Sequence, residues 1–501
     1  MSYHRAFVMK PIIKVMLLNV LFLLVIANLS CSKQSTSQID GPANPPPAND
    51  STVTPNPSVK TDVTLWLTSA DKSALFEKQN VSLLFSQTLN NNPTITVDTS
   101  NTYQSIDGFG FALTGGSAYL IYRLPSDKRS ALLNELFRSD STSIGVSYLR
   151  LSIGSSDLNQ NVFSYDDIPA GQTDTTLKNF DLGADKYNVV PLLKEIVAIN
   201  PNISLIATPW SAPAWMKTNG SSVGGSLNPK YYKVYAQYFV KYIQVMKAEG
   251  IHITAVTPQN EPLYGGNNPS MVMPATAEDD FVKNYLGPAF NAAGLDTKIV
   301  IYDHNCDQPD YPISILNDPV ARKYVDGSAF HLYGGSITAL TQVHNAYPDK
   351  NVYFTEQWTG GPGDFAANLD WHVKNLIIGA TRNWSKNVLE WNLASDPNYQ
   401  PHTPGGCSTC MGALTIGSSI TRNVSYYIIA SAAKFVRPGS KRIASNIIGD
   451  LQNVAFKTPD GQKVLIVLND GSAKQQFNIQ FTNKVVSTSL EAGSVGTYIW
   501  K

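Results

Sequence analysis

Two different hydrophobic patterns divide the chain. Near both ends, β-branched and apolar residues occupy every second position, as in "DVTLWLTS" and "TITVDTS" before residue 101 and in "VAFKTPDGQKVLIVLND", "FNIQF" and "GTYIW" after residue 440. A period of two is typical of β-strands with one buried face. The dipeptides Asp460-Gly461 and Asp470-Gly471 add hairpin-turn signals to the later region. Both ends of the chain are therefore predicted to be rich in β-strands.

The middle of the chain alternates short apolar runs with longer stretches of helical periodicity. Eight runs indicate buried strands: "IDGFGFAL", "VSYLRLSI", "ISLIATPW", "ITAVTPQN", "KIVIYDHN", "GSAFHLY", "NVYFTEQW" and "NVLEWNL". Stretches between them, such as "DKRSALLNELF" and "VVPLLKEIVAIN", predict helices. This alternation favours a (β/α)8 barrel. A doubly wound sheet is the alternative, but "GFGFALTGG" lacks the GxGxxG spacing of a dinucleotide loop.

In a (β/α)8 barrel the functional site lies at the C-terminal ends of the strands, so polar residues there are the candidates. Arg150 lies in the second predicted strand, Asn260 and Glu261 end the fourth, and Glu356 ends the seventh. The other polar and aromatic residues at predicted strand ends are Ser155, Ser156, Asp157, Trp210, Trp215, Asp303, His304, Asn305, His331, Tyr333, Glu390, Trp391 and Asn392.

Glu261 and Glu356 are far apart in the sequence, so only the fold could bring them together. Hydrolysis of a glycosidic bond needs two facing carboxyl groups, one to protonate the leaving oxygen and one to attack or to activate water. Glu261 suits the acid/base role, and the neighbouring Asn260 could bind a sugar hydroxyl. Glu356 suits the nucleophile, which Arg150 and Tyr333 would hold ionised.

Other chemistries find less support in the sequence. A single carboxylate at a barrel rim would be read as structural, but two glutamates with Arg, Tyr, Asn and four tryptophans favour carbohydrate chemistry; the tryptophans are Trp210, Trp215, Trp358 and Trp391. The strand-end residues Asp303, His304 and His331 have no HxH or HExxH spacing to support a metal site. No nucleophile-elbow motif supports a Ser-His-Asp triad. We therefore predict neither a metal nor another cofactor.

Charge and composition narrow the choice of partners. The 38 basic and 38 acidic residues balance, so no net charge points to nucleic acid or to anionic lipid. The 24 tyrosines and 8 tryptophans suit a sugar-binding cleft, and equally a large core. We expect a monomer whose partner is a polysaccharide substrate, with no nucleic acid.

Residues 1–30 predict a signal peptide, because three basic residues precede the apolar run "VMLLNVLFLLVIANLS". Ser30-Cys31 resembles a bacterial lipoprotein cleavage site, although Asn28 stands where an aliphatic residue is usual. Plain secretion and a retained membrane anchor are the alternatives. Residues 31–59, rich in Ser, Pro, Asn and Asp, are expected to form a disordered tether. The expected location is outside the cytoplasm, either anchored to a bacterial outer membrane through the lipid alone or secreted.

Three cysteines remain after Cys31. The spacing "CSTC" of Cys407 and Cys410 fits a local disulfide, a redox pair or half of a metal site. Export favours a disulfide that stiffens a loop, and free thiols are the alternative. Cys306 is expected to be an unpaired, partly buried thiol.

Several motifs resemble glycoside hydrolase family 30, in a clan of retaining enzymes built on (β/α)8 barrels. The motifs are "DGFGFALT", "YLRLSIGSSDLNQNVFSYDD", "ATPWSAPAWMKTNG", "VTPQNEP", "VYFTEQWTGG", "LEWNLASDPNYQP" and "KFVRPGSKRIAS". "VTPQNEP" matches the acid/base motif and "VYFTEQWTGG" resembles the nucleophile motif. The resemblance covers nearly everything after the tether.

This resemblance implies a barrel with a side β-sandwich built from both chain ends. The expected bounds are 60–102 for the N-terminal sandwich strands, 103–436 for the barrel and 437–501 for the rest of the sandwich. It also implies Glu261 as acid/base and Glu356 as nucleophile. Family positions lining the sugar subsite fall on Asn260, Trp210, Arg150, His331, Tyr333 and Trp391, although Trp210 and Trp391 could be core residues and His331 a satisfied rim histidine.

One departure from the family pattern concerns Gly115. In the glucosylceramidase-like branch an acidic residue follows the Thr of the first-strand motif, whereas "ALTGGSA" has Gly115 at that position. We expect this loss to open space beside O4 and O6 of the bound glucose, where a β-1,6-linked neighbour would continue. Loop variation without consequence is the alternative.

The sequence thus predicts a retaining hydrolase of β-linked glucan, most like the family's endo-β-1,6-glucanase branch. Other family activities remain alternatives: β-glucosidase, glucosylceramidase-like, β-xylosidase and xylanase. An alternative of another class is a non-catalytic glycan-binding surface lipoprotein, against which the intact Glu261 and Glu356 pair argues.

Overall fold

The computed structural model of the chain describes residues 59–140 and 143–501. The predicted signal peptide, the lipidation site at Cys31 and the tether up to residue 58 lie outside the described residues. Within the described residues, no helix has the length and apolar character that crossing a membrane requires.

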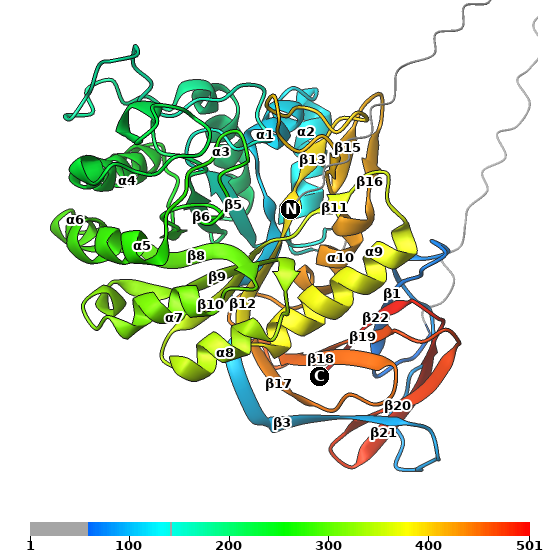
Figure 1. Cartoon of the computed structure of the whole chain (residues 1–501). Coiled ribbons are helices and arrows are strands. Elements are labelled where there is room, and N and C mark those ends of the chain that lie inside the picture. The colour runs from blue at the N-terminus through cyan, green and yellow to red at the C-terminus, as the bar shows by residue number, and fades with distance from the viewer. Residues whose placement is uncertain (1–58, 141–142) are drawn as a thin grey trace, which may run out of the picture. The chain divides into compact units, whose positions relative to one another are not determined.

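Eight parallel strands close into a barrel in the part of the chain that the structure describes, with the order β10-β12-β4-β5-β6-β7-β8-β9 (Figure 1). The barrel strands are β4 (Gly108–Ala112), β5 (Tyr148–Ser152), β6 (Ser204–Thr208), β7 (Ala255–Val256), β8 (Lys298–Cys306), β9 (Val325–Gly335), β10 (Asn351–Glu356) and β12 (Ser385–Asn392). The predicted (β/α)8 barrel is confirmed, and each of the eight predicted runs overlaps one of these strands. Between the strands, apolar side chains fill the barrel: Tyr148, Ile206, Ala255, Val300, Ala329, Tyr353 and Leu389.

Helices cover the outside of the barrel. They are α1 (Gly115–Tyr122), α2 (Ser126–Phe137), α3 (Val189–Ile199), α4 (Tyr232–Ala248), α5 (Ala275–Phe281), α6 (Gly287–Ala292), α7 (Asp310–Asn317), α8 (Ala339–Ala346), α9 (Phe365–His372) and α10 (Val424–Ala433). Two π-helical turns continue helices, η4 (Val282–Leu286) after α5 and η6 (Val373–Ala380) after α9, and the short 3-10 turns are η1 (Gly183–Tyr187), η2 (Ala214–Met216), η3 (Pro229–Tyr231) and η5 (Ala321–Lys323). Most helices bury one face, as their periodicity predicts.

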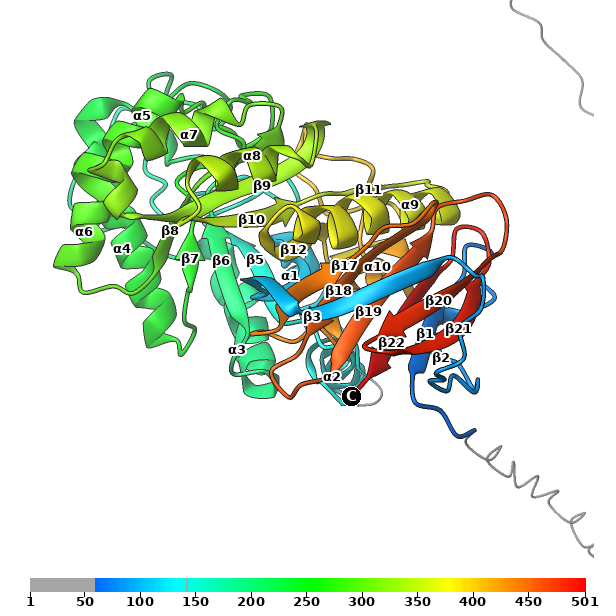
Figure 2. The ribbon, with the colours of Figure 1, turned by 90° about the horizontal axis from the view of Figure 1, so that it is seen from below.

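Both ends of the described chain meet in one nine-stranded sheet beside the barrel, ordered β2-β1-β22-β19-β18-β17-β3-β20-β21 (Figure 2). Its strands are β1 (Thr64–Thr68), β2 (Leu75–Lys78), β3 (Thr94–Ser105), β17 (Lys441–Ser445), β18 (Leu451–Lys457), β19 (Lys463–Asn469), β20 (Gln475–Phe481), β21 (Lys484–Leu490) and β22 (Val495–Trp500). β1 pairs with β22 and β3 pairs with β17, both antiparallel. The predicted side β-sandwich, built from both chain ends, is confirmed.

The inner strand β19 is buried on both faces, whereas the period of two assigned to this region predicted one solvent-facing side. Its five consecutive apolar residues, Val464 to Leu468, fit the burial observed. Val464 and Ile466 belong to the large core of the barrel and its helices. Leu465 and Val467 belong to a second core inside the side domain. α10 is buried along its whole length and contacts both β4 and β22. The side domain is therefore packed against the barrel through an apolar interface, which the period of two could not reveal.

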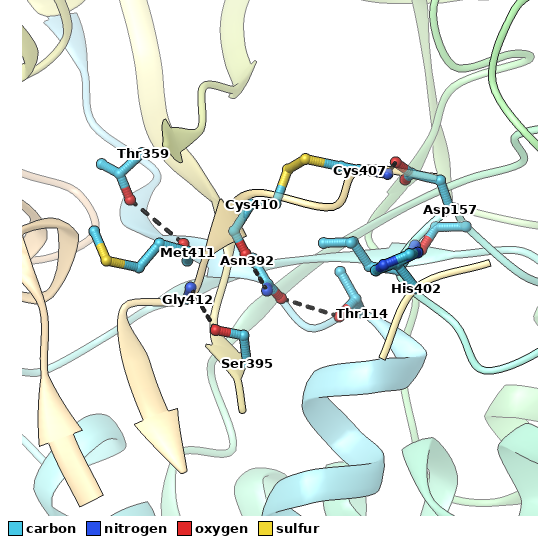
Figure 3. The surroundings of a disulfide bond; sticks show 12 residues. Thr114, Asp157, Thr359, Asn392, Ser395, His402, Cys407, Cys410, Met411 and Gly412 are labelled. Atoms are coloured by element: carbon cyan, nitrogen blue, oxygen red, sulfur yellow. Dashed lines mark hydrogen bonds between the residues drawn. A yellow bond between two sulfur atoms is a disulfide. The ribbon is translucent and has the colours of Figure 1, made fainter. Parts of the chain in front are cut away.

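Short strands shape the rim of the barrel. They are β11 (Thr359–Gly360), β13 (Ala394–Ser395), β14 (Cys410–Met411), β15 (Leu414–Ile416) and β16 (Ile420–Arg422), and β11 pairs with β14. Cys407 and Cys410 form a disulfide beside this pairing (Figure 3). Cys306 is free and buried. The predicted disulfide and the unpaired Cys306 are confirmed, and the burial of Cys306 is fuller than expected.

Candidate active site

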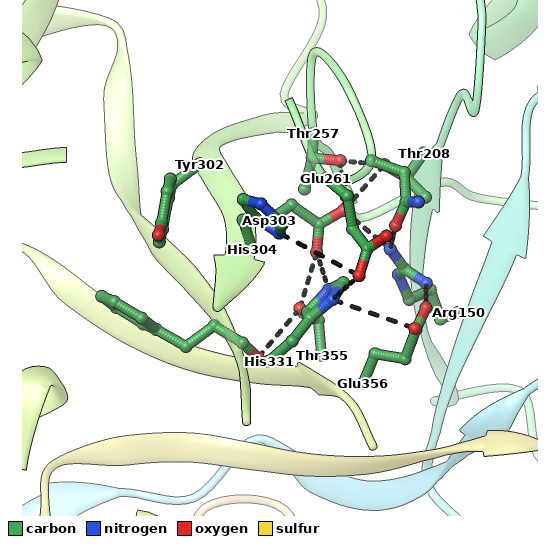
Figure 4. A network of polar contacts seen from close by, with 12 residues as sticks. Arg150, Thr208, Thr257, Glu261, Tyr302, Asp303, His304, His331, Thr355 and Glu356 are labelled. Carbon is green, nitrogen blue, oxygen red and sulfur yellow. Dashed lines mark hydrogen bonds and ion pairs between the residues drawn. The ribbon is translucent and has the colours of Figure 1, made fainter. Parts of the chain in front are cut away.

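The fold brings Glu261 and Glu356 to the same histidine at the C-terminal rim of the barrel. Nδ1 of His331 lies 3.4 Å from Oε1 of Glu261 and 3.8 Å from Oε1 of Glu356. The separation of these two carboxylate oxygens therefore cannot exceed the sum of the two distances. Figure 4 shows contacts from the His331 ring to both carboxylates. This places two carboxyl groups within reach of one glycosidic bond.

The sequence predicted that Glu261 ends a strand. In the structure β7 ends at Val256, and Glu261 lies in the loop that follows. Its backbone amide donates a hydrogen bond to the carbonyl oxygen of Asp303 at 3.0 Å. Glu261, Tyr302 and Asp303 have φ angles of 45°, 77° and 57°, in the left-handed region. Non-glycine residues adopt such angles at a cost, and they cluster at functional sites where surrounding contacts hold them. The irregular backbone at these three residues thus sets the direction of the Glu261 and Asp303 side chains.

Arg150 lies in β5, and its fully buried side chain connects residues from three other segments of the site. Nη1 donates to Oε2 of Glu356 at 2.6 Å, and Nη2 donates to Oδ1 of Asn260 at 2.7 Å. Nη2 also donates to Oδ2 of Asp303 at 2.8 Å. Burial would lower the pKa of Arg150, but the charges of Asp303 and Glu356 raise it above its ordinary value. Arg150 is therefore a fixed cation that orients Glu356 and Asn260 together.

Asp303 is the second anchor of the site, although the sequence reasoning named it only as a rim residue. It is fully buried, and its Oδ1 faces Nε2 of His331 at 3.0 Å. Three threonine hydroxyls also donate to its carboxylate: Thr208, Thr257 and Thr355. Burial would raise the pKa of Asp303, but Arg150 and His331 hold it well below its ordinary value. Asp303 is therefore ionised at neutral pH, and its carboxylate contacts Nε2 of His331.

The protonation of the site follows from these contacts. Burial would lower the pKa of His331, but Glu356 and the hydrogen bond to Asp303 raise it to about 9. Burial raises the pKa of Glu356 above its ordinary value, against the pull of His331 and Arg150. Burial acts in the same sense on Glu261, but the hydrogen bond and charge of His331 lower its pKa. At neutral pH the imidazolium of His331 therefore lies beside both carboxyl groups.

An aromatic wall closes one side of a pocket of about 170 Å³. Trp210 and Trp391 stack with ring centroids 5.2 Å apart, and the Arg150 guanidinium lies 4.8 Å from the Trp210 ring. Tyr333 donates its hydroxyl to Oε1 of Glu356 at 2.9 Å. The residues that line the pocket are Asp157, Trp210, Glu261, Tyr264, Asn267, Tyr333, Glu356, Trp358, Trp391, Cys407 and Cys410. Two larger hollows border the side sheet, but this pocket holds the paired carboxylates.

The pocket includes Asp157, which the sequence reasoning named at a strand end without giving it a role in catalysis or sugar binding. Asp157 is buried, and the backbone amide of Cys407 donates to its Oδ2 at 3.2 Å (Figure 3). Burial, together with the charge of Glu356, raises its pKa to about 7. A carboxyl group in this position can bind sugar hydroxyls. The sequence signal was available, because Asp157 closely follows β5 and its Arg150.

The expectation of open space at Gly115 is wrong. Gly115 is buried and is not part of the pocket wall. A Cβ at Gly115 would lie 1.9 Å from Nδ2 of Asn159, so the Asn159 side chain already fills the space. Asn159 is held there because its Oδ1 accepts hydrogen bonds from Ser156. The missing acid at Gly115 therefore says nothing about room for a second sugar.

Comparisons with known proteins agree with this geometry. Residues 106–435 match the family model described as "Glycosyl hydrolase family 30 TIM-barrel domain", and residues 439–498 match "Glycosyl hydrolase family 30 beta sandwich domain". The endo-1,6-β-D-glucanase of Neurospora crassa is 38% identical over 390 residues, covering 73% of this chain and 79% of that protein.

Two further relatives show the breadth of the similarity. The solved structure of the endo-β1,6-glucanase BT3312 superposes with a TM-score of 0.82 at 38% identity, covering 88% of this chain and 99% of that one. Putative glucosylceramidase 4 of Caenorhabditis elegans is 31% identical over 437 residues, covering 81% of this chain and 83% of that protein. These matches agree with the barrel, its two rim glutamates and the attached sandwich. The chain therefore belongs to glycosyl hydrolase family 30 and is a glycoside hydrolase.

Proposed function

We propose that this enzyme cleaves β-1,6-linked glucan within the chain, with net retention, by a double displacement. The observation that carries the reaction type is that Glu261 and Glu356 line one pocket and both approach Nδ1 of His331. The linkage is supported by the two endo-1,6-β-glucanases that are each 38% identical to the chain. Gly115 no longer supports it.

In this proposal Glu356 is the nucleophile. Arg150 donates to one of its oxygens and Tyr333 donates to the other. Protonation would cost one of these hydrogen bonds, so both contacts favour a carboxylate. The raised pKa of Glu356 and the lowered pKa of Glu261, taken alone, would assign the roles the other way round. We base the assignment on the contacts, because Arg150 bonds to Glu356 and not to Glu261.

Glu261 then serves as the acid and base. It protonates the oxygen that leaves C1, and it later removes a proton from the water that attacks the glycosyl-enzyme. Asn260 accepts from Arg150 through Oδ1, so its amide nitrogen is the group left to donate to a sugar hydroxyl. His331 is the cation between the two carboxylates and limits their mutual repulsion when both are ionised.

The chain should release short β-1,6-linked oligosaccharides from pustulan and little from laminarin. The test is chromatography of early products from both glucans, because an endo-acting enzyme forms a range of lengths before glucose accumulates. No oligosaccharides from pustulan would contradict the proposed linkage. Glucose as the sole early product, or faster turnover of aryl β-glucosides or glucosylceramide, would favour the exo-acting alternatives. Binding of pustulan without turnover would favour the non-catalytic alternative.

The proposal extends to where the enzyme works. The basic and apolar run of residues 1–30 and the following Cys31 support export with a lipid on Cys31, and a monomer on a tether would reach an external polysaccharide. Mass spectrometry of the mature N-terminus tests this. A chain that starts at Cys31 with added acyl groups is expected, and an unmodified start elsewhere would contradict lipid anchoring.

A further inference from the structure

Three side chains at the catalytic rim converge on one point. Oε1 of Glu261 lies 3.4 Å from Nδ1 of His331 and 4.0 Å from Nδ1 of His304. Ligand atoms of all three residues lie within 4.8 Å of one another, and all three residues are buried. Figure 4 shows both imidazole rings turned toward the Glu261 carboxylate. Two imidazole nitrogens and one carboxylate oxygen are the donor set that Zn²⁺ accepts in proteins.

His304 supplies an independent sign that a ligand is missing from this set. Its side chain is only 9% exposed, and within the described residues its Nδ1 is a buried atom without a hydrogen-bond partner. Buried polar nitrogens are normally paired, because an unpaired one costs free energy. Nδ1 of His304 offers a lone pair to a ligand in the tautomer that carries its proton on Nε2.

His331 already has the support that metal-binding histidines usually have. Its Nε2 faces Oδ1 of Asp303 at 3.0 Å, which leaves Nδ1 directed at Glu261. Such a carboxylate behind a histidine fixes the ring and makes the opposite nitrogen a better ligand. Asp303 is itself held by Arg150 and by threonine hydroxyls, so the support is rigid.

The local charge also suits a cation. Glu261, Glu356 and Asp303 supply negative charge at the site, and the fixed positive charge of Arg150 pairs with Glu356 and Asp303. His331 is an imidazolium at neutral pH, so a metal ion must displace the proton from its Nδ1 in order to bind. Zn²⁺ bonds to nitrogen and carboxylate oxygen at about 2.0–2.2 Å, so tetrahedral ligands lie roughly 3.3–3.5 Å apart. The Glu261 and His331 atoms already have this spacing, and His304 needs a small inward shift.

We propose that Glu261, His304 and His331 form a binding site for Zn²⁺ or a similar transition-metal dication, and that the bound ion inhibits hydrolysis. The inhibition rests on the proposed role of Glu261, whose carboxylate cannot deliver a proton to the leaving oxygen while it ligates a metal. The ion is a reversible inhibitor and takes no part in the reaction. The binding itself rests on the geometry alone.

The test uses the complete chain after treatment with a chelator. Calorimetric titration with ZnCl2 should show one site, and Zn²⁺ should inhibit pustulan hydrolysis until EDTA restores the rate. His304→Ala should keep its activity within a few-fold and bind Zn²⁺ about 10-fold or more weakly. His252→Ala is the matched control, because His252 is exposed and pairs with Asp296, and it should leave Zn²⁺ binding unchanged.

Each outcome separates binding from function. Zn²⁺ binding that His304→Ala weakens supports the site even if pustulan proves not to be the substrate, because calorimetry needs no turnover. Absence of a Zn²⁺ site in the wild type, or equal affinity in the wild type and His304→Ala, overturns the proposal. Thermal melts of the variants show whether both remain folded. Zn²⁺ binding at this site without inhibition would overturn the inhibitory role.

Discussion

Replacing Glu356 with glycine is expected to lower kcat on pustulan by roughly 10⁴-fold or more, because no carboxylate remains to attack C1. The same substitution leaves space beside Arg150 and Tyr333, which now bond to the carboxylate. A small anion such as azide should enter that space and attack an activated substrate, 2,4-dinitrophenyl β-gentiobioside. Attack from the side of the missing nucleophile inverts the configuration, so the product should be the α-glycosyl azide.

Two comparisons make this result decisive. Glu356→Gln keeps the size of the side chain and should be equally inactive, but azide should restore little activity because the space stays filled. A thermal melt distinguishes loss of the nucleophile from loss of the fold, since Arg150 would be left with Asp303 as its remaining ion-pair partner. Formation of the β-glycosyl azide would show that Glu356 is not the nucleophile.

The second large effect is expected for Glu261→Ala. Hydrolysis of pustulan should fall by roughly 10³-fold, because its leaving sugar oxygen needs a proton. The first step on 2,4-dinitrophenyl β-gentiobioside should be nearly unaffected, because dinitrophenolate leaves without protonation. The glycosyl-enzyme should then accumulate, and azide should release it as the β-glycosyl azide. The measurement is the rate on both substrates with and without azide, followed by the product's configuration.

Glu261→Gln is the control that preserves the contacts of Glu261 with its neighbours while removing the acid. An equal fall on both substrates, or an α-glycosyl azide, would exchange the roles of the two glutamates. This exchange is a real alternative, because the pKa of Glu356 is raised and that of Glu261 is lowered. The two azide experiments therefore decide which glutamate is the nucleophile: Glu356, as its hydrogen bonds indicate, or Glu261, as the pKa shifts indicate.

Much of the fold could be predicted because its signals are local. Strand periodicity and the alternation with helices depend on neighbouring residues, and each of the eight barrel strands overlaps a predicted run. The rule that strand ends carry the site then pointed to Glu261 and Glu356 without any knowledge of their distance. The apolar run of β19 was a signal that both of its faces are buried. What covers those faces could not be predicted, because it depends on α10 and the barrel packing against the side sheet.

The rest of the site depends on contacts between distant segments. The left-handed backbone of Tyr302 and Asp303 has no glycine to reveal it, yet it directs the Asp303 carbonyl to the amide of Glu261. The prediction for Gly115 failed for the same reason. A glycine in the sequence indicates a missing side chain, but only the fold shows that Asn159 fills its place.

The most direct test of the whole account is proton NMR of pustulan during the first minutes of its hydrolysis by the wild-type enzyme. The account predicts new reducing ends that appear first as the β-anomer, on oligosaccharides of several lengths, and then mutarotate to the equilibrium mixture. This result requires both retention at C1 and cleavage within β-1,6-linked chains. New ends that appear first as the α-anomer would contradict the double displacement, and the absence of new reducing ends would contradict the substrate.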